Sequence, residues 1–381
     1  MEPPFSKTFC YAPFTNLEIL PGGSILPCCK FVDRYYDTQY NFATHSAEEY
    51  LKSEKLAVVK QELLDGKWPL GCERCRIDEE HNIRSRRQLD YDRWQHHYDA
   101  YDIASEELIT LSLAITATCN LKCIICRPTA SSAWKKEYKD LYGIQVPIIE
   151  EPRKKLISKF TDFAPNLVHL AIHGGEPLLS NKKEHGDLLD FYIESGQSKN
   201  ISIHYTTNGT IWPQEEWLER WRHFEEIDFQ ISIDGIGDRF EYLRYPAKWD
   251  NIVDNVKGFI AHEKANTNFR LSVAHTVSGF NVYYIDEFVT WCNDIGLPKP
   301  WLSKLHNPNH LRPTVWPNTA KQCIIEKLLT SQWPEVRNWA DLIEKNDDSD
   351  QFEEFKNYMT RHDKYRKISY QQLFPELKAY L

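Results

Sequence analysis

The feature that most limits how this chain can fold is an alternation of short apolar runs with longer amphipathic stretches between residues 106 and 305. The runs are rich in β-branched residues and have the length of strands, and the stretches between them have the length of helices. This alternation predicts βαβ units, in which functional loops follow the carboxyl ends of parallel strands. The predicted strands are 111–116, 167–173, 201–206, 229–233, 270–276 and 300–303, and the predicted helices are 129–142, 183–196, 214–224, 249–264 and 283–295.

We expect an α/β protein with a partial (β/α)6 TIM-like barrel and two flanking regions. Five or six strand–helix units are too few for a complete eightfold barrel, so the barrel is open. Residues 1–105 contain five of the ten cysteines and a helix-like span at 47–64, and they form a small domain. Residues 306–381 follow a linker with several prolines and are mostly helical in pattern. The predicted domains are therefore 1–105, 106–305 and 306–381.

Charge and hydropathy limit the partners of the chain. There are 46 Lys and Arg residues against 55 Asp and Glu, a net charge of −9, which argues against a protein built to neutralise nucleic-acid phosphates or anionic lipid. No apolar run approaches the roughly 20 residues that span a bilayer. The first residues also lack the pattern of a secretory signal. We expect a soluble, cytoplasmic protein with neither a membrane nor a nucleic acid as its partner.

Three closely spaced cysteines directly follow the first predicted strand. Residues 119–126 read CNLKCIIC, which places Cys119, Cys123 and Cys126 in a Cys-x3-Cys-x2-Cys pattern. Three thiolates at this spacing can bind three irons of a cubane cluster and leave the fourth iron open to a substrate or cofactor. The alternative for these cysteines alone is a zinc site completed by a distant histidine.

The loops after the next three strands contain glycine-rich and polar motifs. Gly174-Gly175-Glu176-Pro177 follows the second strand, where two glycines permit close approach of a ligand and Glu176 offers an acceptor for a cationic amine. The sequences TTNG at 206–209 and SIDG at 232–235 follow the third and fourth strands. Asn-Gly and Asp-Gly pairs are common in turns, so it is their order and their place at strand ends that indicate a site.

With these motifs in this order, residues 106–305 resemble the radical S-adenosylmethionine (SAM) superfamily. The resemblance implies a barrel of the radical SAM type, a [4Fe–4S] cluster on the three cysteines, and SAM bound to the open iron through its amino and carboxylate groups. The Gly174–Pro177 turn would hold the methionyl amine, and Ile125, where an aromatic residue is usual, would cover the adenine. The residues implied to bind SAM are Gly174, Gly175, Glu176, Pro177, Thr207, Asn208, Ser232, Asp234, Arg244 and Ile125.

The N-terminal cysteines form a second group. Cys10, one of the Cys28–Cys29 pair, Cys72 and Cys75 supply four thiolates. If the pair lies on a strand, its side chains face opposite ways, so only one is a ligand, and we select Cys28. The layout resembles the twitch domain, a shortened SPASM domain, which here precedes the radical SAM core instead of following it. The resemblance implies an auxiliary [4Fe–4S] cluster, and a structural zinc ion is the alternative.

The resemblance further implies an enzyme that reductively cleaves SAM to a 5′-deoxyadenosyl radical, which abstracts a hydrogen atom from a substrate carbon. Its partner would be a reductant such as flavodoxin or ferredoxin. An auxiliary cluster with four cysteine ligands would transfer electrons, which favours modification of a peptide or protein, or another oxidative bond formation. A dehydrogenase or rearrangement enzyme acting on a small sugar- or nucleotide-type metabolite is the alternative. A noncatalytic zinc-binding scaffold is the alternative from another class, and no individual catalytic residue is predicted.

Other conspicuous residues are interpreted as structural. Cys292 and Cys323 lie in apolar, helix-like stretches and are expected to pack in the interior. The arginines between residues 74 and 87 are expected to pair with nearby acidic residues on a solvated face. The sequences DKYR at 363–366 and FPEL at 374–377 resemble the end of twitch-containing radical SAM proteins, without a role assigned to them.

Overall fold

The computed structural model divides the chain into two compact units. It describes residues 6–20, 23–105, 107–146, 166–180 and 182–381. The first unit comprises Met1–Thr118, Pro147–Thr206 and Pro213–Asp228, and the second comprises Cys119–Val146, Thr207–Trp212 and Phe229–Leu381. Both contain parallel strands connected by helices, so the predicted α/β class is confirmed. The division into domains 1–105, 106–305 and 306–381 stays a prediction.

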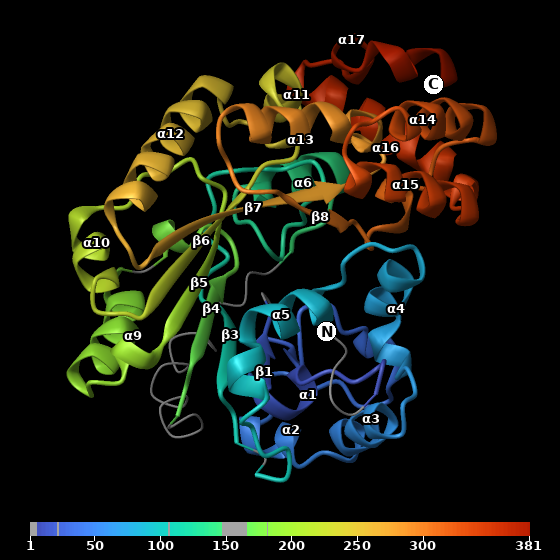
Figure 1. Cartoon of the computed structure of the whole chain (residues 1–381). Coiled ribbons are helices and arrows are strands. Elements are labelled where there is room, and N and C mark those ends of the chain that lie inside the picture. The colour runs from blue at the N-terminus through green and yellow to red at the C-terminus, as the bar shows by residue number, and fades with distance from the viewer. Residues whose placement is uncertain (1–5, 21–22, 106, 147–165, 181) are drawn as a thin grey trace. The chain divides into compact units, whose positions relative to one another are not determined.

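The first unit contains a sheet with the strand order β2-β1-β3-β4-β5 (Figure 1). The β1–β2 pair is antiparallel, and the pairs from β1 to β5 are parallel. The strands predicted for the core begin at residue 111, yet β1 pairs with β3 and extends the sheet towards the N-terminus. Ala114 of β3 is in register with His173 of β4, so the loops after these strands begin side by side. The strands are β1 (Asn16–Ile19), β2 (Ile25–Leu26), β3 (Thr110–Ala114), β4 (His169–His173) and β5 (Ser202–Thr207).

The helices near the N-terminus pack around an aromatic core. The ring of Tyr11 stacks on that of Tyr98, with centroids 4.3 Å apart. The prediction of one helix over 47–64 is wrong, because the hydroxyl of Ser53 accepts the N–H of Leu56 and caps a second helix there. The helices of this unit are α1 (Ala12–Thr15), α2 (Ala47–Leu51), α3 (Glu54–Leu64), α4 (Glu73–Glu80), α5 (Arg86–Tyr98), α9 (Lys182–Glu194) and α10 (Glu215–Trp221).

The second unit contains strands in the order β6-β7-β8, of which β7 and β8 are parallel. Alternate residues of β7 are buried, as expected for a strand with one face packed against other elements. The predicted strands and helices of the core are confirmed, with strand ends shifted by three residues or fewer. The elements are β6 (Glu226–Ser232), β7 (Phe269–Val277), β8 (Trp301–Lys304), α6 (Trp134–Tyr142), α11 (Gly237–Leu243), α12 (Trp249–Ala265) and α13 (Ile285–Asp294).

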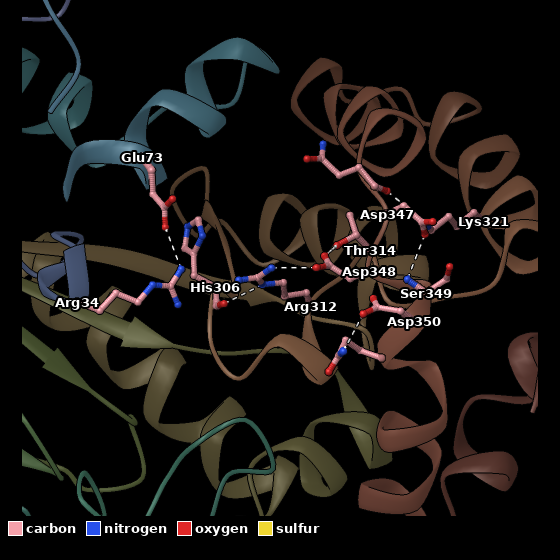
Figure 2. Close-up of polar contacts among 12 residues, drawn as sticks. Arg34, Glu73, His306, Arg312, Thr314, Lys321, Asp347, Asp348, Ser349 and Asp350 are labelled. Atoms are coloured by element: carbon pink, nitrogen blue, oxygen red, sulfur yellow. Dashed lines mark hydrogen bonds and ion pairs between the residues drawn. The ribbon is translucent and has the colours of Figure 1, made fainter. Parts of the chain in front are cut away.

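The C-terminal region is helical, as predicted, and polar contacts connect its loops (Figures 1 and 2). Arg312 donates to Asp348 over 2.9 Å, and Thr314 donates to the same carboxylate. Lys321 lies 2.5 Å from Asp347, and this hydrogen bond lowers the pKa of Asp347 to about 2. The helices are α14 (Asn318–Leu329), α15 (Pro334–Lys345), α16 (Phe352–Arg366) and α17 (Tyr370–Leu373). Within the described residues, no helix is both long and apolar enough to cross a bilayer.

Candidate functional site

The three cysteines after β3 lie close together in one loop of the second unit. All three are half-buried free thiols. Burial raises the pKa of Cys123 to about 12 and that of Cys126 to about 11, and the charges of the neighbouring thiols act in the same direction. This mutual effect requires proximity of the three sulfurs. Because Cys123 and Cys126 resist ionisation as free thiols, a cationic metal centre would be needed to stabilise their thiolates.

Backbone and serine hydrogen bonds hold this loop in place. The N–H groups of Lys122 and Ile124, on either side of Cys123, donate to the carbonyls of Tyr245 and Leu243 over 2.6 and 2.8 Å. The hydroxyl of Ser131 donates to the carbonyl of Leu121 over 2.6 Å, and the Ser132 hydroxyl accepts the N–H of Cys119. Because Ser131 and Ser132 form hydrogen bonds with the cysteine loop, α6 begins at Trp134 and not at residue 129 as predicted.

Asn208, in the loop after β5, contacts the cysteine loop directly. Its side-chain amide donates to Oδ1 of Asn120 over 2.9 Å and lies 3.8 Å from the sulfur of Cys119. Its Oδ1 accepts the backbone N–H of Thr210. The polar motif after β5 therefore reaches the first of the three cysteines.

Asp234 and Arg244 form a buried ion pair beside the same loop. Nη2 of Arg244 lies 2.8 Å from Oδ2 of Asp234, whose Oδ1 accepts the N–H of Thr276. Burial disfavours the charge of Arg244, but Asp234 and the sulfurs of Cys123 and Cys126 outweigh burial and raise the pKa of Arg244. Among the described residues, Nε of Arg244 has no hydrogen-bond partner. A buried donor of this kind fits an anionic group of a ligand.

The Gly174–Pro177 turn in the first unit packs against the backbone that leads into the cysteine loop. Gly174 has a φ of +89°, and a Cβ atom there would lie 2.5 Å from the carbonyl oxygen of Thr116. At Gly175 a Cβ atom would lie 2.2 Å from the carbonyl oxygen of Thr118. The N–H of Glu176 donates to that same oxygen over 2.8 Å. The close approach of the Thr116 and Thr118 carbonyls therefore requires both glycines. From the sequence alone, the glycines were expected to permit the close approach of a ligand.

Other residues implied to bind SAM have local structural contacts. The carboxylate of Glu176 is fully buried and accepts the N–H of Leu178. The hydroxyl of Thr207 accepts the N–H of Gly209. Ser232 ends β6, and Ile125 is half-buried between the second and third cysteines. The roles of these residues stay predictions.

Four N-terminal cysteines line one pocket of the first unit. Cys10, Cys28, Cys72 and Cys75 all border the same pocket. Burial raises the pKa of Cys10 to about 12 and of Cys75 to about 11, and it raises the pKa values of Cys28 and Cys72 as well. Among the described residues, no group of three His, Cys, Asp or Glu side chains is arranged to hold a single metal ion.

Cys28 and Cys29 differ in their neighbours. They follow β2 in a turn and not on a strand, so the strand on which sequence reasoning relied is absent at this point. Apart from Cys29 beside it, the charges that raise the pKa of Cys28 are those of the other three pocket cysteines. Those acting on Cys29 come mainly from Glu18 and Arg86. The selection of Cys28 as a ligand stays a prediction, now supported by this difference.

Several residues interpreted as structural have structural contacts. Cys292 is buried at 1 % exposure as expected, but Cys323 is only half-buried. Arg76 of α4 pairs with Glu80 at 2.8 Å on an exposed face as expected. Arg87 of α5, 2.5 Å from Glu79, is instead buried and not on a solvated face. Nε2 of His173 lies 2.7 Å from the carboxylate of Glu18 on β1, which no sequence motif indicates.

Sequence reasoning missed the contacts of α16 with the cysteine loop. Tyr358, His362 and Arg366 of this helix contact the loop or Glu137 of α6. The DKYR motif at 363–366 marks part of this helix, but the sequence does not indicate what it contacts.

Comparison with known proteins identifies one domain. Residues 113–289 match the model of the radical SAM superfamily. The chain is 21% identical over 237 residues to a GTP 3′,8-cyclase of Actinobacillus pleuropneumoniae, covering 61% of this chain and 63% of that protein. It is 27% identical over 214 residues to an uncharacterized protein of Methanocaldococcus jannaschii, covering 55% and 66%. The chain thus spans less than two thirds of the length of these curated relatives.

Solved structures give weaker similarities. The structure of anSMEcpe with bound AdoMet is 17% identical, with a TM-score of 0.38 over 51% of this chain and 48% of that one. Streptococcus suis SuiB bound to the precursor peptide SuiA is 14% identical, with a TM-score of 0.34 over 70% and 46%. The match to the radical SAM superfamily model is thus confined to residues 113–289, and the similarity to the curated relatives covers only part of either chain.

Proposed function

We propose that this enzyme binds a [4Fe–4S] cluster on Cys119, Cys123 and Cys126 and reductively cleaves SAM. The observation that supports this most directly is the grouping of the three thiols in one loop, where Cys119 raises the pKa of both Cys123 and Cys126. Three protein ligands leave one position of a four-iron cluster for an external ligand. When bound, the cluster and SAM together supply a 5′-deoxyadenosyl radical that abstracts a hydrogen atom from a substrate carbon.

The residues around the loop have the chemistry that SAM requires. In this proposal Arg244 offers its unpartnered Nε–H to the methionyl carboxylate, while Asp234 keeps the guanidinium charged and oriented. Asn208 orients the loop at Cys119. The Gly174–Pro177 turn offers backbone acceptors to the methionyl amine. Thr207, Ser232 and Ile125 keep the roles that the family resemblance implies.

We further propose an auxiliary [4Fe–4S] cluster on Cys10, Cys28, Cys72 and Cys75. A single zinc ion would need all four sulfurs about 2.3 Å from one point. Among the described residues no three His, Cys, Asp or Glu side chains are arranged around a single ion, and the four thiols instead border one pocket, which favours a larger group. The pocket is also lined by Lys30, Arg86 and Arg87, whose positive charges favour the thiolates. With four cysteine ligands, such a cluster would accept or pass on electrons.

The proposed auxiliary cluster would be a second electron carrier, and it indicates the class of reaction. Electron transfer to an auxiliary cluster suits an oxidation, and we propose peptide or protein modification or another oxidative bond formation. The second candidate is a reaction on a small sugar- or nucleotide-type metabolite, which the similarity to a GTP 3′,8-cyclase favours. We propose flavodoxin or ferredoxin as the reductant, the cytoplasm as the location, and the N-terminal residues 1–105 as the twitch-like domain.

The test is anaerobic reconstitution with iron and sulfide, followed by reduction in the presence of SAM. We expect a brown protein with the iron and sulfide of two clusters that releases 5′-deoxyadenosine. A variant with Ser at positions 119, 123 and 126 should lose the iron of one cluster and all SAM cleavage. A colourless, zinc-containing protein that leaves SAM intact would contradict the proposal and favour the scaffold alternative.

A further inference from the structure

The carbonyl groups on either side of Cys123 are both bound by one helix. The hydroxyl of Tyr358 on α16 donates to the carbonyl of Ile124 over 2.8 Å. Nη2 of Arg366, two turns further along α16, donates to the carbonyl of Lys122 over 2.8 Å. The N–H groups of Lys122 and Ile124 are already bound to the last residue of α11 and the segment that follows it. All four backbone polar groups of the residues that flank Cys123 are therefore satisfied.

A buried carboxylate connects α16 to the loop a second time. The side chain of Glu137 on α6 is fully buried and accepts hydrogen bonds from Nε of Arg366 at 2.8 Å and Nδ1 of His362 at 2.9 Å. Nζ of Lys122 lies 3.0 Å from its other oxygen. Burial alone would raise the pKa of Glu137, but these partners outweigh burial and lower the pKa to about 2.

We expect this buried network to fix the backbone conformation of the loop more than to raise the stability of the fold. A buried charged network is often no more stabilising than apolar residues of similar volume, because each charge must be removed from water. Its fixed hydrogen bonds instead select one backbone conformation. Here the selected conformation is that of the loop bearing Cys119, Cys123 and Cys126, and the Arg366 guanidinium is further confined by the rings of Trp134 and Tyr245 at 5.0 Å.

We propose that α16, which lies outside residues 113–289, is a positioning element of the three-cysteine site. Tyr358 and Arg366 act through the backbone of Ile124 and Lys122 and hold Cys123 in the orientation in which it binds iron. The inference rests on the proposed function, because a loop that binds no cluster needs no such positioning. It gives the C-terminal region a role in the chemistry of the core.

The experiment compares two tyrosines of the same helix. Tyr358→Phe removes the hydroxyl that binds the loop, whereas Tyr365→Phe removes a hydroxyl that donates to Asp140 of α6 over 2.7 Å. Each variant loses one tyrosine hydrogen bond, partly buried for Tyr358 and exposed for Tyr365, so urea unfolding of both variants measures any difference in general stability. The first readout is hydrogen exchange of residues 119–126 in the metal-free full chain. The second is the rate of iron release to a chelator from the reconstituted protein, with and without SAM.

We expect Tyr358→Phe to raise the rate of amide exchange in the loop. It should also raise the rate of iron release to the chelator, for the iron whose release depends on SAM, by about tenfold, the effect of one hydrogen bond. Tyr365→Phe should stay within about twofold of the parent by the same measure. Equal behaviour of the two variants would overturn the positioning role. A parent protein that binds no iron at the three cysteines would overturn the proposed function, and the inference with it.

A second pair of variants tests the guanidinium. Arg366→Lys keeps the positive charge near Glu137 but loses the fork that reaches both the carboxylate and the Lys122 carbonyl. Arg337→Lys on α15 is the control, since Arg337 also donates to a backbone carbonyl, that of Ser331, over 2.7 Å. Only Arg366→Lys should slow SAM cleavage in folded protein. If both variants slow it alike, the role of Arg366 is structural and the proposal fails at this residue.

Discussion

Nη2 of Arg244 lies 2.8 Å from Oδ2 of Asp234, and both side chains are buried, at 9% and 0% exposure. The family resemblance implied each residue separately, and the structure joins them beside Cys123. In a buried pair, loss of one partner leaves the other charge in a medium of low dielectric constant. The pair is therefore expected to be important for stability as well as for ligand binding.

Replacing Arg244 with Gln should lower the free energy of unfolding of the metal-free protein by about 3 to 5 kcal/mol, because Asp234 keeps an uncompensated buried charge. Urea unfolding measures this loss. The double variant that also carries Asp234→Asn should recover part of it, since no charge then remains buried without its partner.

Arg220→Gln is the matched control for this prediction. Arg220 binds Asp190 through Nε and Nη2 at 2.8 and 2.9 Å, but the two side chains are 27% and 40% exposed. A solvent-exposed pair contributes less than about 1 kcal/mol, so the control should lose little stability. Equal losses in the Arg244 and Arg220 variants would show that burial of the first pair has no special importance.

Cys28→Ala and Cys29→Ala should differ in iron content. Cys28 borders the pocket with Cys10, Cys72 and Cys75, whereas the charges acting on Cys29 come mainly from Glu18 and Arg86. After reconstitution, Cys28→Ala should lose iron of the auxiliary cluster and keep SAM cleavage, and Cys29→Ala should keep both. Iron analysis and 5′-deoxyadenosine release measure the outcome, and the opposite assignment follows if only Cys29→Ala loses iron.

Gly175→Ala should weaken SAM binding. The new Cβ atom would lie 2.2 Å from the carbonyl oxygen of Thr118, which is backbone and directly precedes Cys119, so the turn or the loop must move. We expect SAM affinity, measured by equilibrium dialysis, to fall at least about tenfold, the loss produced by one or more misplaced hydrogen bonds.

Gly186→Ala is the control for Gly175→Ala. At Gly186 the nearest atom to a Cβ would be the flexible end of Arg220, at 3.3 Å. Alanine in the interior of α9 favours the helix by about 1 kcal/mol over glycine. This variant should bind SAM as the parent does, and a similar loss of affinity in both variants would refute the steric explanation.

Glu137 should make stability depend on pH at acid values. Its pKa is lowered from 4.5 to about 2 in the folded chain, so its contribution is fully present above about pH 4.5 and is lost as the pH falls toward 2. The shift corresponds to about 3 kcal/mol at neutral pH. Urea unfolding of the metal-free parent and of Glu137→Gln should show a difference that is constant above pH 5 and decreases below it. A difference independent of pH down to pH 3 would contradict the assignment.

Local sequence pattern was sufficient for the elements of the core. Strands such as β5 and β7 and helices such as α12 are defined by the period of their apolar residues, which depends only on local geometry. The prediction of one helix over 47–64 was wrong because Ser53 caps a second helix within this span. The cap is a local hydrogen bond, which the period of the apolar residues does not detect. The strands β1 and β2 are too short for a clear pattern, and β1 forms by pairing with β3.

The amino-acid sequence by itself determined the chemistry offered by this protein: seven cysteines in two groups, a glycine turn that admits close backbone approach, and polar residues at strand ends. These depend on residue type and spacing. Only the tertiary structure decided which groups meet, including the pairing of Arg244 with Asp234 and the binding of Lys122 by Arg366, far along the chain. The physical reason is that buried charges must find partners, and those partners come from whichever segments the packing brings together.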